Sequence, residues 1–406
     1  MNEQEGARFK VQGARKTTRS LGLKKVCVVV GSRANYSSIK SAMRAIKDHP
    51  GLELSLVAGA SALLDRYGSV VNLIESDGFV PDAKLYMLVE GETPATMAKS
   101  TGLGLMELPT ILERLAPDFV LTVGDRFETM ATTLAAAYMN IPIAHTMGGE
   151  VTGTIDESIR HAVTKFAHVH FPASQDAAER IIKLGEREVD VHMVGCPRID
   201  LVAEILAVVE KEPLVGEMPG GVGHPIKLEE PFLLVSQHPV TTEYGTGEAQ
   251  IRATLEAVDR SGLQAVVLWP NADAGSDDIA RGIRKWREQG RGPKMQYFKN
   301  LPIDTYVALM RQTACLVGNS SSGIREGAFI GTPCVDIGTR QNARAAGHNV
   351  LDVEEYDADA IFEGIQRQIE HGRYEMDRIY GDGKAGERIA EVLSTKSVDV
   401  QKQITY

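Results

Sequence analysis

The sequence predicts an α/β protein made of two doubly wound, Rossmann-like domains. Short apolar runs of the kind that form buried parallel strands alternate along the chain with segments whose apolar residues recur at helical spacing. These runs end in short loops rich in glycine and polar residues. The 406 residues suffice for two sizeable hydrophobic cores. We expect the two domains to face each other across a cleft.

The composition limits the class of protein. Hydrophobic residues account for 43% of the chain and charged residues for 24%, which is ordinary for a soluble globular protein. A net charge of −10 argues against a general nucleic-acid or anionic-membrane binder, so local arginines and helix N-termini must hold any bound anion. The four cysteines form no CxxC pair, which favours reduced thiols in a cytoplasmic protein. No apolar run reaches the roughly 20 residues needed to span a membrane, and no signal peptide is visible.

The N-terminal domain is expected at residues 25–196, after a mobile, basic tail at residues 1–24. Apolar runs predict its strands at 26–30, 52–57, 118–123, 141–145 and 190–194. Apolar residues at helical spacing predict its helices at 39–46, 63–74, 93–115, 128–139 and 156–167.

The C-terminal domain is expected at residues 197–380 and repeats the same plan. Its strands are predicted at 232–236, 265–269, 315–317 and 334–337. Residues 212–230 are rich in glycine and proline and predict a surface loop. Residues 381–406 contain a last helix, around 386–393, which could pack back on the first domain.

Polar side chains gather where the predicted strands end. In open α/β sheets, ligands bind beyond the carboxyl ends of the strands. Six strand ends carry such groups, namely Arg33, 125–126, 145–150, His238, 271–276 and 320–326. We therefore expect a single site, with the acids mostly on the first domain and the nucleotide contacts mostly on the second.

The best-defined loop joins the strand at 315–317 to a short helix. Its serines, Ser320 and Ser321, and the free N–H groups of the helix start are typical of a phosphate site. Glu326 follows, and a carboxylate repels phosphate but accepts hydrogen bonds from sugar hydroxyls such as those of a ribose. The loop therefore predicts a site for a nucleoside diphosphate.

Several of these residues also have a purely structural interpretation. Asp125 could cap the helix after it, and Asp156 stands at a helix start, where acids are favoured regardless of function. His238 could be a loop histidine, and Arg33 a surface residue. Glu150 is harder to explain in this way, because the two glycines before it let the backbone approach a ligand closely.

No metal site is predicted. His168 and His170 alternate along a strand, which favours residues of a sheet face. Asp357 and Asp359 form a DxD pattern, but at a helix start they favour a cap. No zinc-like spacing is present.

Seven strings of residues, in order along the chain, carry a family resemblance. They are SRANYS at 32–37, GDRFE at 124–128, GGEVTGTIDESIRHAVTK at 148–165, QHPVTTE at 237–243, PNADAGS at 270–276, GNSSSGIRE at 318–326 and GTRQNAR at 338–344. With them the chain resembles the hydrolysing UDP-N-acetylglucosamine 2-epimerases of sialic-acid-type sugar synthesis, including the epimerase half of the bifunctional animal enzyme. The resemblance implies the two-domain GT-B arrangement.

The reaction that the resemblance implies has two steps. UDP leaves C1 of the sugar as a proton leaves C2, which gives a 2-acetamidoglucal. Water then adds, and the products are UDP and N-acetylmannosamine. A placed carboxylate must take the C2 proton, and arginines and helix N-termini must stabilise the departing diphosphate.

The resemblance also assigns roles by matching position. Asp125 and Asp156 correspond to catalytic acids, with Glu150 as a further candidate, and His238 contacts the diphosphate. The residues that help to hold the nucleotide sugar are Arg33, Ser37, Arg126, Asn271, Asp273, Ser276, Ser320, Ser321, Glu326 and Arg340. No metal or redox cofactor is implied, and the family suggests a homodimer or homotetramer.

Two positions depart from the family. Asn35 replaces an aspartate that many members carry, and Met147 replaces a catalytic glutamate of the animal members. A thioether cannot transfer protons. Either Glu150 takes the role, or Asp125 and Asp156 suffice, or the substrate is a UDP- or GDP-linked diacetamido-trideoxy sugar of legionaminic acid synthesis.

Two other classes of function stay open. A GT-B glycosyltransferase would share the diphosphate loop, although the acids of the first domain argue against it. A non-catalytic sugar-nucleotide sensor is favoured only by Met147.

Overall fold

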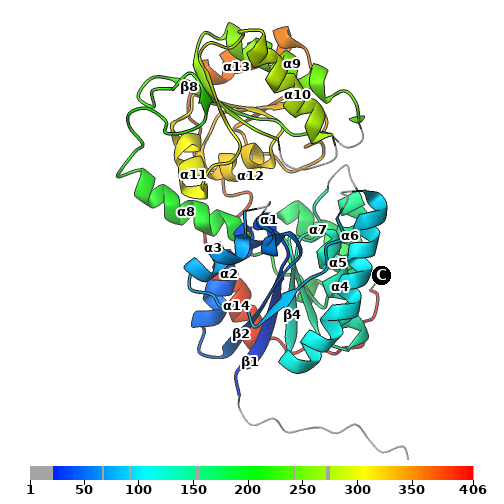
Figure 1. Cartoon of the computed structure of the whole chain (residues 1–406). Coiled ribbons are helices and arrows are strands. Elements are labelled where there is room, and N and C mark those ends of the chain that lie inside the picture. The colour runs from blue at the N-terminus through cyan, green and yellow to red at the C-terminus, as the bar shows by residue number, and fades with distance from the viewer. Residues whose placement is uncertain are drawn as a thin grey trace, which may run out of the picture.

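The computed structural model describes residues 22–65, 68–90, 93–151, 155–240, 243–270 and 275–405. The predicted basic tail lies outside the described residues up to residue 21, and the first strand already begins at Lys24. The structure contains two sheets, one in each half of the chain, and each sheet with its helices forms an α/β unit. The two units lie one above the other in Figure 1. Among the described residues, no helix combines the length and apolarity that crossing a membrane requires.

The first sheet has six parallel strands in the order β3-β2-β1-β4-β5-β6. The strands are β1 (Lys24–Val30), β2 (Leu52–Gly59), β3 (Ala83–Leu85), β4 (Phe119–Val123), β5 (Ile143–Thr146) and β6 (Val169–Phe171). The helices that follow these strands are α1 (Arg33–Ser37), α2 (Lys40–Asp48), the 3-10 turn η1 (Ala60–Leu63), α3 (Val70–Ser76), α4 (Pro94–Leu115), α5 (Phe127–Tyr138), α6 (Ile155–Phe166), α7 (Gln175–Lys183) and the turn η3 (Glu188–Asp190).

The second sheet has the order β13-β12-β11-β8-β9-β10-β7, parallel except for the short edge strand β7. Its strands are β7 (Val222–Gly223), β8 (Phe232–Ser236), β9 (Gln264–Leu268), β10 (Met295–Phe298), β11 (Cys315–Gly318), β12 (Cys334–Ile337) and β13 (Val350–Val353). The helices are α8 (Pro197–Val209), α9 (Gly247–Arg260), α10 (Ser276–Glu288), α11 (Ile303–Gln312), α12 (Ser321–Ile330), α13 (Ala358–His371) and α14 (Ala385–Thr395).

Both sheets use the same strand order, counted from their central first strand. β1 lies beside β4, and β8 beside β11, while the strands between them in sequence lie on the other side. The order therefore reverses between β1 and β4 and between β8 and β11, and such switch points are where open α/β sheets bind ligands. The predicted fold of two doubly wound domains is confirmed.

The strands are buried on both faces because each sheet carries helices on both sides. Along β1, Val26, Val28 and Val30 pack in one hydrophobic cluster, and Cys27 and Val29 pack in another. The strands of the second sheet are divided in the same way between two clusters. This two-sided burial explains why the strands read as continuous apolar runs.

Three predicted segments differ from the structure. The expected helix at 63–74 is interrupted, since Gly68 and Ser69 have positive φ angles of 86° and 41°, and helix α3 begins only at Val70. The expected strand at 190–194 is a 3-10 turn followed by one bridge, because Asp190 turns its carboxylate to Arg187 and Lys396.

The third difference is in the expected surface loop at 212–230. Met218, Ile226 and Leu228 are buried there against the second sheet, and β7 pairs with β10. The strands β3, β10 and β13 have no counterpart among the predicted strands.

The chain passes between its two halves twice, at the same place. The N–H of Cys196 donates to the carbonyl of Tyr380 over 2.7 Å, and the backbones of Gly195 and Gly381 touch. After the second passage, α14 lies against α2 of the first half (Figure 1), where Ile389 and Leu393 pack in the same cluster as Met43 and Ile46.

Candidate active site

The carboxyl ends of the two sheets face one another. Arg325 of α12, after β11, forms an ion pair with Glu150, after β5. Arg344, after β12, donates from Nε to the carbonyl of Val151 over 3.0 Å. The loops that follow the strands of one sheet thus contact those of the other, as the sequence predicts for a shared site.

Asp125 lies at the first switch point, directly after β4 and Gly124. Its carboxylate forms an ion pair with Arg160 of α6, and its side chain is 23% exposed. The N-cap residue of the following helix α5 is Arg126, so Asp125 does not cap that helix. Asp125 is therefore a carboxylate in an ion pair that stays partly open to a ligand.

Arg160 connects Asp125 to the loop after β5. Its Nη2 reaches Asp125, and its Nη1 donates to the carbonyl of Glu150 over 2.7 Å. Asp156 lies one turn earlier on the same helix and is half-buried. Arg160 therefore contacts both the Asp125 carboxylate and the Glu150 backbone, and Asp156 lies on the same helix as Arg160.

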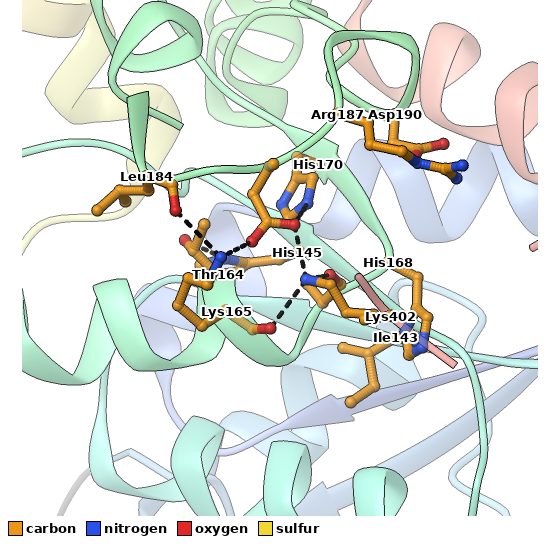
Figure 2. Close-up of polar contacts among 12 residues, drawn as sticks. Ile143, His145, Thr164, Lys165, His168, His170, Leu184, Arg187, Asp190 and Lys402 are labelled. Atoms are coloured by element: carbon orange, nitrogen blue, oxygen red, sulfur yellow. Dashed lines mark hydrogen bonds and ion pairs between the residues drawn. The ribbon is translucent and has the colours of Figure 1, made fainter. Parts of the chain in front are cut away.

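His145 holds the turn at Gly124 and Asp125 in place through a hydrogen bond to its backbone. This buried side chain of β5 donates from Nε2 to the carbonyl of Gly124 over 2.8 Å. Its Nδ1 lies 3.2 Å from the hydroxyl of Thr164, and both of these side chains are labelled in Figure 2. Burial lowers the pKa of His145 to about 3, so the ring is neutral and has one N–H to donate. The ring fixes the turn that presents Asp125.

The loop after β5 is tightly constrained. Gly149 has a φ angle of 76°, and a Cβ there would lie 2.2 Å from the carbonyl oxygen of Ala177, so only glycine fits. Met147 also has a positive φ, 60°, and is partly buried against the core of the second half. A left-handed conformation at a residue with a large side chain is uncommon and often marks a functional loop.

The first strand loop supplies the predicted cation Arg33. It lies exposed in the short helix α1, and Ser37 at the end of that helix accepts a hydrogen bond from Arg198 Nη1 over 3.3 Å. Asn35 is buried and accepts from the N–H of Gly31, so this departure from the family serves the turn itself. Arg126, across the switch point, donates from Nε to Glu128 over 3.0 Å.

Helix α12 starts at the second switch point. Ser320 is its N-cap and accepts from the N–H of Ser322, and the two hydroxyls lie 2.8 Å apart. Ser321 is the first helical residue and is partly exposed. The predicted helix start with its serines is confirmed, and the N–H groups of its first turn are suited to an anion.

His238 lies across from this helix start, after β8. Its backbone N–H donates to Asn319 Oδ1 over 2.7 Å, and the side-chain amide of Asn319 donates to the backbone carbonyl of His238 over 2.9 Å. Burial, followed by the charge of Arg340, lowers the pKa of His238 to about 3. Arg340 itself donates to the carbonyl of Asn319 over 3.1 Å. His238, Arg340 and the α12 start are therefore gathered around one asparagine.

Four further predicted residues have different outcomes. Glu326 is 2% exposed and forms an ion pair with Arg198 Nε at 2.5 Å, so its carboxylate already has a cationic partner. Ser276 is the first residue of α10 and is partly exposed. Asn271 and Asp273 lie outside the described residues.

The arginines at the site that were not predicted as site residues include Arg160, Arg198 and Arg325. Arg160 stands four residues after Asp156, which places both near one face of a helix, and that spacing was the available signal. The partners of Arg198 and Arg325 lie 128 and 175 positions away in the sequence, and no local pattern indicates such pairs.

The arginines make the site electropositive. Burial, followed by the charges of Arg344, Arg325 and Arg180, lowers the pKa of Arg160 to about 9. Burial and the charge of Arg325 likewise lower the pKa of Arg344 to about 10. Crowded, partly desolvated guanidinium groups favour an anion. Within the described part of the chain, no three His, Cys, Asp or Glu side chains gather as a metal site would require.

Comparison with known proteins agrees with this geometry. A sequence model of the family described as UDP-N-acetylglucosamine 2-epimerase matches residues 44–394. The UDP-N,N'-diacetylbacillosamine 2-epimerase (hydrolyzing) of Legionella pneumophila is 31% identical over 373 residues, which are 92% of this chain and 96% of that protein. The UDP-N-acetylglucosamine 2-epimerase of Neisseria meningitidis is 28% identical over 387 residues, 94% of this chain and 98% of that protein.

Solved structures share the fold. The crystal structure of the Neisseria meningitidis UDP-GlcNAc 2-epimerase bound to UDP-GlcNAc superimposes with a TM-score of 0.76 at 17% identity, and the match covers 92% of this chain and all of the other. The two-sheet arrangement, the motifs at its switch points and the match along most of the sequence agree. The chain belongs to the UDP-N-acetylglucosamine 2-epimerase family.

Proposed function

We propose that this protein is a hydrolysing sugar-nucleotide 2-epimerase, which converts UDP-N-acetylglucosamine to N-acetylmannosamine and UDP. The observation that carries the proposal is that the Asp125–Arg160 ion pair lies at the switch point of one sheet and the start of α12 at that of the other, while Arg325 of α12 pairs with Glu150 of the first half. A base for the C2 proton and a site for the departing diphosphate are what an elimination requires. Family membership supports the same reaction class.

The nucleotide is held by the second half in this proposal. The diphosphate lies at the α12 start, on Ser320 and Ser321, because free N–H groups and the positive end of a helix favour an anion. His238 contacts it as a neutral donor. The other proposed contacts of the nucleotide sugar are Arg33, Ser37, Arg126, Asn271, Asp273, Ser276, Glu326 and Arg340.

Proton transfer is assigned to Asp125 and Asp156. One carboxylate takes the proton from C2 as the C1–O bond to the diphosphate breaks, and the product is the 2-acetamidoglucal. Water then adds across the double bond, with its hydroxyl on C1 and a proton on C2 from the opposite face. Because C2 loses a proton from one face and receives one on the other, two acids on different elements suit the reaction. The role of Glu150 stays a prediction, since its carboxylate is paired with Arg325.

A diacetamido-trideoxy sugar carried by UDP or GDP is the second candidate substrate. Met147 replaces the family carboxylate with an apolar side chain, which suits a sugar that lacks a hydroxyl. The similarity to the Legionella pneumophila UDP-N,N'-diacetylbacillosamine 2-epimerase (hydrolyzing) favours the same substrate.

The test is proton NMR of reactions run in deuterated water. UDP-N-acetylglucosamine and UDP- and GDP-linked diacetamido sugars are supplied separately. The correct substrate releases nucleoside diphosphate, and the free 2-epimerised sugar carries deuterium at C2. Sugar transfer to an acceptor without C2 exchange would indicate a glycosyltransferase. Binding without any release would indicate a sensor.

A homodimer or homotetramer in the cytoplasm completes the proposal. Its support is the family resemblance and four buried cysteines without disulfides. Size-exclusion chromatography with light scattering distinguishes a monomer from these assemblies.

A further inference from the structure

Helix α12 reaches the first half of the molecule through two charged residues of its second turn. Arg325 forms an ion pair with Glu150 after β5. Glu326 forms an ion pair with Arg198, which in turn donates to Ser37 in the first half. The helix that starts at the proposed diphosphate site therefore also carries contacts to the side of the acids.

The pair of Arg325 and Glu150 is buried and lies beside the place where the chain passes between its halves. Glu150 is 5% exposed and Arg325 is 8% exposed. The guanidinium of Arg325 lies 5.5 Å from the ring centroid of Tyr380, and the carbonyl of Tyr380 accepts from Cys196. The pair therefore joins the two halves beside the backbone crossing and adds a side-chain contact to it.

Arginines hold the loop at 149–151 from both halves. From the first half, Arg180 donates to the carbonyl of Gly149, and Arg160 donates to the carbonyl of Glu150. From the second half, Arg325 binds the Glu150 carboxylate and Arg344 donates to the carbonyl of Val151. The same loop leads, through residues 152–154, into the helix that carries Asp156.

We propose that Arg325 is a positioning residue that, through Glu150, fixes the loop at 149–151, which leads to Asp156, relative to helix α12. In this proposal Glu150 serves the ion pair instead of transferring a proton. A buried carboxylate that pairs with a guanidinium is costly to leave unpaired, so the pair holds the two halves in one relation. The catalytic part of this inference rests on the proposed function, whereas the contact between the halves does not.

The kinetic test compares Glu150→Gln, Arg325→Gln, the double variant and the exchange of Glu150→Arg with Arg325→Glu. If the two residues act as a pair, each single variant lowers kcat by about 10- to 100-fold with KM within about threefold, and the double variant is at most about threefold worse than either. The exchanged pair recovers activity to within about tenfold of the wild type, because a charge pair is restored.

A proton-transfer role for Glu150 predicts a different pattern. Glu150→Gln would then lose more than about 1,000-fold while Arg325→Gln stays within about threefold, and the losses would multiply in the double variant. That pattern would overturn the proposal. The double Gln variant decides the matter even if the exchanged pair does not fold.

A distance measurement separates the inference from the proposed function. Spin labels on cysteines introduced at Glu107 of α4 and Arg284 of α10, both exposed, report the distance between the halves, since all four native cysteines are buried. Without any substrate, the distribution of distances between the two labels should become broader in Glu150→Gln and in Arg325→Gln than in the wild type. The distribution stays unchanged in the control Arg44→Gln, which breaks only an exposed pair with Glu204.

The two readouts fail independently. If the wild type acts on no donor, the proposed function fails, and the distances alone decide whether the pair joins the halves. Unchanged distances in both single variants would refute the inference even where the wild type is an active epimerase.

Discussion

Asp125 is the residue on which the proposed elimination depends most directly. We expect Asp125→Asn to lower the rate of nucleoside diphosphate release by about 10²- to 10⁴-fold, because an amide cannot take the C2 proton. Binding of UDP stays within a few-fold, since the proposed diphosphate site lies on the other half. Nucleotide release and calorimetric UDP binding give the two measurements.

The exposed Asp48 offers the matched control, and Asp48→Asn should leave both quantities unchanged. Full activity of Asp125→Asn would remove this carboxylate from the mechanism.

Asp336 predicts a dependence of stability on pH. Burial and the neighbouring Asp352 carboxylate raise the pKa of Asp336 from 3.8 to about 7. The folded protein binds this proton more tightly than the unfolded chain, so the contribution of Asp336 to stability is complete below about pH 4 and is lost as the pH rises to about 7. Asp336→Asn removes this loss. Its free energy of unfolding relative to that of the wild type should therefore increase by up to about 4 kcal/mol as the pH rises from 4 to 8.

Urea unfolding at pH 5 and pH 8 measures this gain. Asp352→Asn is a second test. Removing the Asp352 charge should lower the pKa of Asp336, so this variant should be more stable than the wild type at pH 8. A difference between Asp336→Asn and wild type that is the same at both pH values would contradict the assignment.

At the residue scale, the sequence indicated the acids better than their partners. Asp125 and Asp156 follow strand ends or helix starts, and such positions can be read from local spacing. The same local view suggested a capping role for Asp125, but the carboxylate pairs with Arg160, and the N-cap of the helix is Arg126. An ion pair between distant segments depends on the packed fold, which local periodicity does not encode.

At the scale of elements, the end of α6 is fixed by the last residues of the chain. Lys402, Lys165 and His170, which are labelled in Figure 2, all contact the buried carboxylate of Glu186. Lys402 also donates to the carbonyls of Lys165 and Ala167, which are the free carbonyls at the end of that helix. The C-terminal segment thereby caps the helix that carries Asp156 at its other end.

Glu186→Gln should destabilise the protein by about 1–3 kcal/mol at pH 7, because the partly exposed Lys165 and Lys402 lose the carboxylate that they share. Burial raises the pKa of Glu186, but hydrogen bonds from His170, Lys165 and Lys402 outweigh it and bring the pKa from 4.5 to about 2. The stabilisation is therefore present above about pH 4.5 and is lost as the pH falls towards 2. Chemical unfolding at pH 7 and pH 3 tests both the size and the sign.

Lys402→Met should resemble Glu186→Gln at pH 7. Lys227→Met is the control, because its ion pair with Glu230 is exposed, and it should leave the unfolding midpoint unchanged. Equal stability of Glu186→Gln and the wild type at pH 7 would show that the C-terminal cap contributes nothing.

The elements that the sequence misplaced have local causes. Continuous apolar runs predicted the central strands of both sheets, since burial on both faces selects such runs. The helix predicted at 63–74 failed because Gly68 and Ser69 adopt left-handed angles. Asp357, in contrast, caps α13 by accepting from the N–H groups of Asp359 and Ala360, as its DxD spacing at a helix start predicts.

At the scale of the whole molecule, the chain is not divided into two continuous pieces. The first sheet and its helices bury α14, which comes after the entire second half (Figure 1). A strand pattern shows where each sheet begins, but it does not show which core receives a terminal helix. That contact determines which part of the chain can fold alone.

A fragment of residues 22–195 should therefore be much less stable than the same fragment joined to residues 381–405. Without α14, the buried side chains Ile389 and Leu393 are lost, and each contributes about 1.5–3 kcal/mol. This is a large share of the roughly 5–15 kcal/mol that stabilise a typical domain. A linker of about two residues suffices for the joined chain, since Gly195 and Gly381 touch.

Urea unfolding followed by circular dichroism compares the two chains. The joined chain should unfold cooperatively at a higher urea concentration, and Leu393→Asp within it should remove the gain, because a buried charge without a partner is costly. If the fragment 22–195 unfolds with the same midpoint as the joined chain, α14 is only an appendage, and the first half is complete without the end of the sequence.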